Sequence, residues 1–132
     1  LPAGRAMLAC MPAENVEECF ATVHFKAFTE HTVTDVEILK CELNRIRQQG
    51  FAFTRDQLKV GISAFGMPVF DITGKPAAGI DVIIQSLKLS TEKRDLVTSS
   101  MRQISAEFSL QMGFSVDLYT GMQEARNIIP FA

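Results

Sequence analysis

The stretch GISAFGMPVFDITGKPAAGIDVIIQ, residues 61–85, decides the fold. Residues 62–70 form an apolar run typical of a buried strand, and residues 76–85 form a second run. Between them, DITGK at 71–75 carries the Asp, Thr and Gly residues that favour a tight turn. The stretch therefore predicts strand, turn, strand.

The two faces of the second strand differ in composition. One face is uniformly apolar and consists of Ala78, Ile80, Val82 and Ile84. The other face mixes small, aliphatic and polar residues: Ala77, Gly79, Asp81, Ile83 and Gln85. We expect the apolar face to pack on a helix, whereas the small residues around Gly79 favour a cavity.

A helix over residues 35–49 is predicted by the strongest local signal outside the strands. Thr34 and Glu37 have the spacing of a capping box, and Gly50 stands where the helix should end. The apolar residues between them recur at helical spacing and are Val36, Leu39, Leu43 and Ile46. Its charged opposite face predicts a solvated surface.

Two shorter helices are expected before it. Residues 4–11 have apolar residues three and four apart, and Pro12 ends that helix and begins the next. We expect three residues of the second helix to face inward: Val16, Phe20 and Val23. After Gly50, Phe51 and Phe53 alternate with small residues, which indicates a further strand.

A long helix is expected after the hairpin. Ser90 caps it, Gly113 ends it, and the predicted apolar stripe consists of Val97, Met101, Ile104 and Phe108. The alternation of Phe114, Val116 and Leu118 predicts a short strand, and the tail through residues 128–131 is expected to dock on the body or on another subunit. Together these elements predict an α+β domain with a mainly antiparallel sheet.

Composition excludes several classes of function. The 132 residues, of which 47% are hydrophobic, suit one globular domain. A net charge of -2 gives no attraction for nucleic acid, and we expect no membrane segment and a soluble cytoplasmic protein. Three cysteines without CxxC spacing are expected to be reduced, and no metal or other cofactor is expected. The start without Met leads us to expect further sequence upstream.

Several segments taken together resemble the effector domain of IclR-type bacterial transcription regulators. These segments share the order and spacing of that domain. They are GRAMLA (4–9), TVTD (32–35), EL (42–43), IR (46–47), GFA (50–52), GI (61–62) and PVFD (68–71). The resemblance covers residues 4–113, a partial effector-binding domain, and leaves 114–132 as a tail. It implies a GAF-like domain that binds a small metabolite, forms homodimers or homotetramers, and follows a winged helix-turn-helix domain. The family's strands before the first helix, like that domain, lie outside this chain.

The resemblance also implies a ligand site between the sheet, the start of the helix at 4–9 and the loop at 54–61. Free N–H groups at a helix start attract an anion, and a glycine permits close approach. The candidate ligand-binding residues are Gly4, Met7, Thr54, Asp56, Ala64, Asp81 and Ile83. These residues depart from the carboxylate, thiol and hydroxyls of relatives that bind small carboxylates, so a glyoxylate-like ligand is not expected. An apolar or aromatic effector is expected instead, because Phe53, Phe65, Met67 and Met7 could line an apolar cavity.

Asp81 is the most informative of these residues, because a carboxylate within an apolar strand needs a partner or solvent. The ligand, Arg5, Lys59 or Thr54 are the partners considered. An edge position facing solvent is the equal alternative.

Two other functions stay open. In an enzyme, Asp56 and Asp81 would be the acid-base pair, although His24 and His31 lack metal-ligand spacing and no nucleophile or phosphate-loop motif occurs. Alternatively, the domain senses nothing and only oligomerises. A face at Gly79 filled by protein side chains would favour this last alternative.

Overall fold

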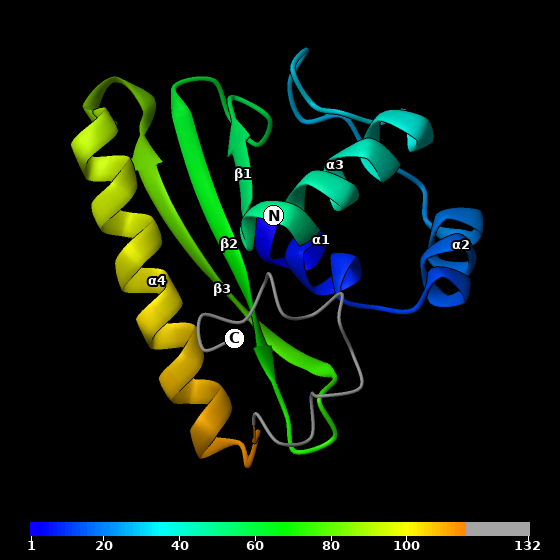
Figure 1. Ribbon diagram of the computed structural model, residues 1–132. Helices are drawn as coiled ribbons and strands as arrows, with labels where there is room; N and C mark the ends of the chain where they lie inside the picture. Colours follow the sequence, from blue (N-terminus) through cyan, green and yellow to red (C-terminus); the bar gives the residue numbers. More distant parts are fainter. Residues whose placement is uncertain (116–132) are drawn as a thin grey trace.

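The computed structural model describes residues 1–115, which form an α+β domain, as the sequence predicts. The elements in chain order are α1 (Pro2–Ala9), α2 (Ala13–Thr22), α3 (Val36–Gln49), β1 (Ala52–Arg55), β2 (Ile62–Phe70), β3 (Pro76–Gln85), the short 3-10 helix η1 (Ser86–Lys88) and α4 (Thr91–Gln111). The sheet separates α4 on one face from α1 on the other, and α3 and α2 lie beyond α1 (Figure 1).

The sheet is antiparallel with the order β1-β2-β3, and both strands of the predicted hairpin are confirmed. At the turn, the N–H of Asp71 donates to the carbonyl of Lys75 over 3.0 Å. Gly74 adopts a φ of 76°, a conformation that a residue with a side chain rarely takes. The turn residues therefore fix the pairing of the two long strands.

Helix α4 covers the apolar face of the sheet, as predicted from the alternation in β3. Phe65, Met67 and Met101 are buried at the centre of this interface. The half-buried residues packed around them include Ile80, Val82, Ile84 and Val97. Ser90 begins the helix by accepting a hydrogen bond from the N–H of Lys93 over 3.2 Å, which confirms the predicted cap.

The predicted apolar stripe of α4 is wrong in its second half. Ile104 and Phe108 are 41% and 49% exposed, whereas Ser105 and Ser109 face the sheet. The Ser105 hydroxyl donates to the carbonyl of Pro68 over 2.6 Å, and the N–H of Phe70 donates to Ser109 Oγ over 3.0 Å. Buried backbone groups at the irregular end of β2 need hydrogen-bond partners, and serines supply them.

Helix α1 lies against the opposite face at its small residues. A Cβ added at Gly66 would fall on the backbone of Pro2 and Ala3, so only glycine permits this approach. The other side of α1 packs on α3, where Ala6, Leu43 and Ile46 belong to one buried cluster. One short helix thus joins the sheet to the outer helices.

Two details near α2 and α3 differ from expectation. The N-cap of α3 is Asp35, whose side chain accepts from the N–H of Ile38 over 3.0 Å, and not Thr34 of the predicted capping box. Asp35 is one residue closer to the first turn of α3 than Thr34, and its carboxylate is a strong acceptor for the unpaired N–H groups there. Val23 follows α2 and is 43% exposed, because the helix ends at Thr22.

The structure describes only the beginning of the C-terminal segment for which a strand and a docking tail are predicted. Phe114 is buried, with its ring 5.7 Å from that of Phe70. Two predictions lie outside the described residues. They are the part of the 114–118 strand beyond Ser115 and the docking of residues 128–131. Within residues 1–115, no helix is both long enough and apolar enough to span a membrane.

Replacing Gly66 with alanine should displace α1 and lower the free energy of unfolding by about 1–3 kcal/mol, the usual cost of overpacking. The measurement is chemical denaturation followed by circular dichroism. Gly4→Ala is the matched control, since an added Cβ there meets nothing within 4 Å. It should instead stabilise by about 0.5–1 kcal/mol through helix propensity. Equal stability of Gly66→Ala and the original chain would contradict the packing described.

Candidate ligand-binding site

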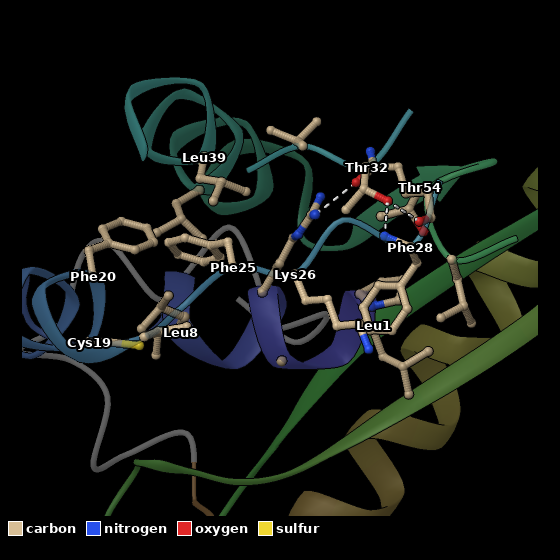
Figure 2. A pocket seen from close by; sticks show the side chains of 18 of the residues that line it. Leu1, Leu8, Cys19, Phe20, Phe25, Lys26, Phe28, Thr32, Leu39 and Thr54 are labelled. Atoms are coloured by element: carbon tan, nitrogen blue, oxygen red, sulfur yellow. Dashed lines mark hydrogen bonds between the residues drawn. The ribbon is translucent and has the colours of Figure 1, made fainter. Parts of the chain in front are cut away.

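A hollow of about 480 Å³ lies on the side of α1 that faces away from the sheet. Helices α1, α2 and α3, the segment 23–33 and the end of β1 border it, and one side is open to solvent (Figure 2). Much of its wall is apolar and includes Leu8, Phe20, Phe25, Phe28, Leu39 and Leu43. Cavities of this size and character accommodate small organic ligands.

The periodicity of α1 explains why the hollow forms there. Leu1, Gly4, Arg5 and Leu8 recur at helical spacing and line the hollow. Ala3 lies on the other side of the helix against the glycines of the sheet. The helix therefore divides the space between the sheet and α3 into a filled side and an open side.

Gly4 and Thr54 are the two predicted site residues that line this hollow. Gly4 belongs to the first turn of α1, and Thr54 is the third residue of β1. Met7 lies on the opposite side of α1, where its sulfur would be 3.3 Å from a Cβ placed at Gly79. The structure therefore brings only part of the predicted set to the open space.

Ala64, Asp81 and Ile83 share the α1 side of the sheet with Thr54. The strand register aligns Thr54, Ala64 and Ile83 in one row across the three strands. Ala64 is 1% exposed and Ile83 is 52% exposed. Asp81 lies in the next row, opposite Gly66. These residues are neighbours, as the resemblance implies, but they lie outside the residues that line the hollow.

The partner of Asp81 is the start of α1. Its Oδ1 accepts a hydrogen bond from the N–H of Ala3 over 2.9 Å, and among the described residues Arg5, Lys59 and Thr54 form no hydrogen bond or ion pair with it. A carboxylate is favourable at this position because the first N–H groups of a helix are unpaired and its N-terminus is positive. The half-buried Asp81 thus fastens α1 to the sheet.

Asp56 stabilises the loop after β1. It adopts a φ of 60°, and its Oδ1 accepts from the N–H of Gly61 over 2.7 Å. Its backbone carbonyl accepts from the hydroxyl of Thr29 over 2.6 Å, which ties the loop to the segment over the hollow. Asp56 and Asp81 thus each accept a hydrogen bond from a different part of the backbone, Gly61 N–H and Ala3 N–H.

The expected cavity at Gly79 is filled by α1. A Cβ at Gly79 would lie 2.6 Å from the Cβ of Ala3. Small strand residues therefore serve helix packing here, and the open space lies one layer further out. A filled face at Gly79 favours the alternative that the domain only oligomerises. The hollow on the far side of α1 favours ligand binding instead.

Arg5 and Gln57 are polar residues that line the hollow. The sequence did not predict this role for either residue. Arg5 donates to Glu42 over 2.6 Å and to Oε1 of Gln57 over 2.7 Å. The Thr32 hydroxyl donates to the Gln57 carbonyl over 2.6 Å. The spacing of Arg5 from Leu8 would have placed it on this side of α1. Gln57 follows no periodic pattern, so only the fold reveals it.

Neither the acidic residues nor the cysteines indicate a metal site. Among residues 1–115, no group of three or more His, Cys, Asp or Glu side chains is arranged to hold a metal ion. The three cysteines, Cys10, Cys19 and Cys41, are free. Burial raises the pKa of the Cys10 thiol to about 12, with Arg47 acting weakly in the opposite direction.

Several proteins to which this chain is similar are transcription regulators. The regulator KdgR of Escherichia coli is 28% identical over 111 residues, which cover 84% of this chain and 42% of KdgR. The crystal structure of the KdgR C-terminal domain has a TM-score of 0.81 at 27% identity, over 86% of this chain and 69% of that one. Thermotoga maritima IclR also gives a TM-score of 0.81, at 30% identity over 86% of this chain and 46% of that one.

A more distant structure is the inducer-binding domain of PobR from Acinetobacter, a double mutant in complex with 3-hydroxybenzoic acid. Its TM-score is 0.74 at 21% identity, over 83% of this chain and 63% of that one, which shows the fold alone. The fold and these relatives define a domain of a bacterial transcriptional regulator. Residues 2–110 match the family described as bacterial transcriptional regulator IclR C-terminal, and the chain belongs to that family. It spans less than half the length of KdgR.

Cys10 should be the slower of two cysteines to react with iodoacetamide at pH 8, because alkylation requires the thiolate and its pKa is raised. Cys41 is exposed and provides the internal comparison. Peptide mass spectrometry after timed quenching gives both rates, and Cys41→Ser confirms the assignment. The rate at Cys10 should rise about tenfold for each pH unit while the thiol is mostly protonated. Equal rates of Cys10 and Cys41 in the folded chain would contradict the raised pKa of Cys10.

Proposed function

We propose that this chain is the effector-binding part of an IclR-family regulator and that its ligand occupies the hollow beside α1. Ligand binding would bias DNA binding by a helix-turn-helix domain that lies outside this chain. In this proposal the domain is a sensor without enzymatic activity. The working form is a homodimer or homotetramer.

The single observation that carries the proposal is the hollow itself. It is bordered by three helices, the segment 23–33 and the end of β1, and has the volume of a small-ligand cavity. Gly4 and Thr54, which the family resemblance implies as ligand residues, both line it. The occurrence of the same fold in an inducer-binding domain supports this assignment.

The position of α1 suggests how a ligand would act. One side of α1 lines the hollow, and the other side contacts the sheet through Gly66 and Gly79. A ligand that binds one position of α1 more tightly would shift the balance between subunit arrangements. A coupling free energy of about 1–3 kcal/mol suffices for regulation.

A panel of small carboxylates, aromatic acids and amines should include compounds that raise the melting temperature of the chain. A ligand present at about 100 times its Kd adds about 2.7 kcal/mol to the free energy of unfolding. Val23 lines the hollow, so Val23→Trp should occupy part of the cavity and abolish the shift. Leu87→Trp is the control, since Leu87 is 99% exposed and lies outside the hollow. A folded chain that responds to no compound would refute the sensor.

A second candidate function, oligomerisation without sensing, is favoured by the outer surface of α4. Its exposed apolar residues are Leu96, Ile104, Phe108 and Leu110, and Met112 follows at its end. Exposed apolar side chains gathered on one helix often belong to protein interfaces. Sensing and oligomerisation are compatible, since a ligand that favours one arrangement of subunits shifts the balance between arrangements.

Phe108→Glu should shift the chain toward monomer, because a carboxylate would be desolvated in an apolar interface. Sedimentation equilibrium measures the association. Gln111→Glu adds the same charge to the same helix at an exposed polar position and should leave the oligomer intact. If both variants associate like the original chain, α4 is not the interface.

A further inference from the structure

We infer that a second binding site, at the open edge of β1, takes a phosphoryl group. The site is a crevice of about 80 Å³ between the second half of α3, the start of β1 and the first turn of α4. It shares only Arg5 with the hollow beside α1, so the two spaces are separate. The inference does not depend on the proposed function.

β1 lies at an edge of the sheet, where half of its backbone groups have no strand to pair with among residues 1–115. The N–H of Asp56, just after the strand, donates to the carbonyl of Ile62 over 2.8 Å and extends the register of β1 on β2. Bonded and non-bonded residue pairs alternate along an antiparallel ladder, so the N–H groups of Phe53 and Arg55 point away from β2. Phe53 lines the crevice and brings a hydrogen-bond donor to it.

Arg94 reaches this edge from α4. The Cζ atom of its guanidinium lies 4.5 Å from the centre of the Phe53 ring. Stacking of this kind uses the face of the guanidinium and leaves the N–H groups at its rim able to donate. Arg94 is half-buried, and no carboxylate of residues 1–115 lies within ion-pair distance of it. Its positive charge is thus held at the crevice without being neutralised by the described part of the chain.

Arg45 brings a second such charge from the other side of the sheet. Helices α3 and α4 lie on opposite sides of β1 (Figure 1), and Arg45 of α3 lines the same crevice as Arg94. Arg45 also has no carboxylate within ion-pair distance among the described residues. The third lining arginine, Arg5, is paired with Glu42 over 2.6 Å. Three arginines and one glutamate give the described lining a net charge of +2.

A phosphoryl group matches this lining in charge, shape and size. It carries up to two negative charges near pH 7 and has three acceptor oxygens. Guanidinium groups bind phosphate oxygens in pairs through parallel N–H bonds, and a backbone N–H can donate to the third oxygen. A volume of about 80 Å³ is far below the roughly 300 Å³ at which pockets for organic ligands begin. The crevice therefore suits a tetrahedral oxyanion, either free phosphate or the phosphoryl group of a molecule whose remainder stays outside.

The position of the bound group is tested by NMR titration of the isotope-labelled 132-residue chain with inorganic phosphate. The ionic strength is held constant with chloride at about pH 7. The amide proton of Phe53 should move downfield as it donates to the phosphate. The amide of Arg55 also points away from β2 but lies outside the crevice, and it should keep its position. No shift at Phe53 in millimolar phosphate, or an equal shift at both amides, would overturn the inference.

The contribution of the arginines is tested by isothermal titration calorimetry, with circular dichroism to verify the fold. Arg94→Gln and Arg45→Gln should each weaken phosphate binding about tenfold, the effect of one charge-assisted hydrogen bond. Arg55→Gln removes the same charge from an exposed arginine outside the crevice and is the matched control, with a change of less than about twofold expected. Because Arg45 is exposed, Arg45→Gln decides the matter if loss of the contact with Phe53 unfolds Arg94→Gln.

Glycerol 3-phosphate in the same calorimetric assay distinguishes the two sources of the phosphoryl group. Tighter binding of glycerol 3-phosphate than of inorganic phosphate would identify a phosphorylated small molecule as the ligand class. Equal or weaker binding would identify free phosphate, and both results support the site. An unchanged affinity in Arg45→Gln, or an equal loss in Arg55→Gln, would overturn the inference, because the anion would then not be bound by the crevice.

Discussion

The close approach of α1 to the sheet at Gly66 is the constraint on which the rest of the structure depends. Any side chain at Gly66 would occupy the space of the helix backbone. The same contact brings the N–H of Ala3 within 2.9 Å of Asp81. With one side of α1 fixed in this way, helical periodicity determines that Arg5 and Leu8 face outward, toward α3 and the segment 23–33.

The position of Asp81 in β3 affects both the placement of α1 and the hydrogen bonding at its N-terminus. Its hydrogen bond to α1 holds the helix where the hollow can form beside it. Its carboxylate also satisfies the N-terminal end of that helix, which is the natural place for an anion. One carboxylate thus serves both the docking of the helix and the hydrogen-bond demand of its first turn.

On the opposite face of the sheet, the hydrogen-bond demand of backbone groups decides which residues of α4 are buried, against the apolar periodicity of its sequence. The first half of α4 packs Met101 on β2 as hydrophobic periodicity predicts. In the second half, Ser105 and Ser109 bond the backbone at the end of β2, which turns Ile104 and Phe108 toward solvent. These apolar side chains therefore stay exposed on the outer surface of α4.

The sequence by itself determined the hairpin at 62–85, the helix at 36–49 and the α+β class, because each depends on local periodicity, caps and turn residues. Only the tertiary structure decided that Asp81 pairs with a helix N-terminus and that Gly79 meets a helix instead of a cavity. It also decided that Gln57 and Arg5 meet at the hollow. These contacts join residues up to 78 positions apart, and a pattern read along the chain carries no information about which distant backbone will approach a given side chain.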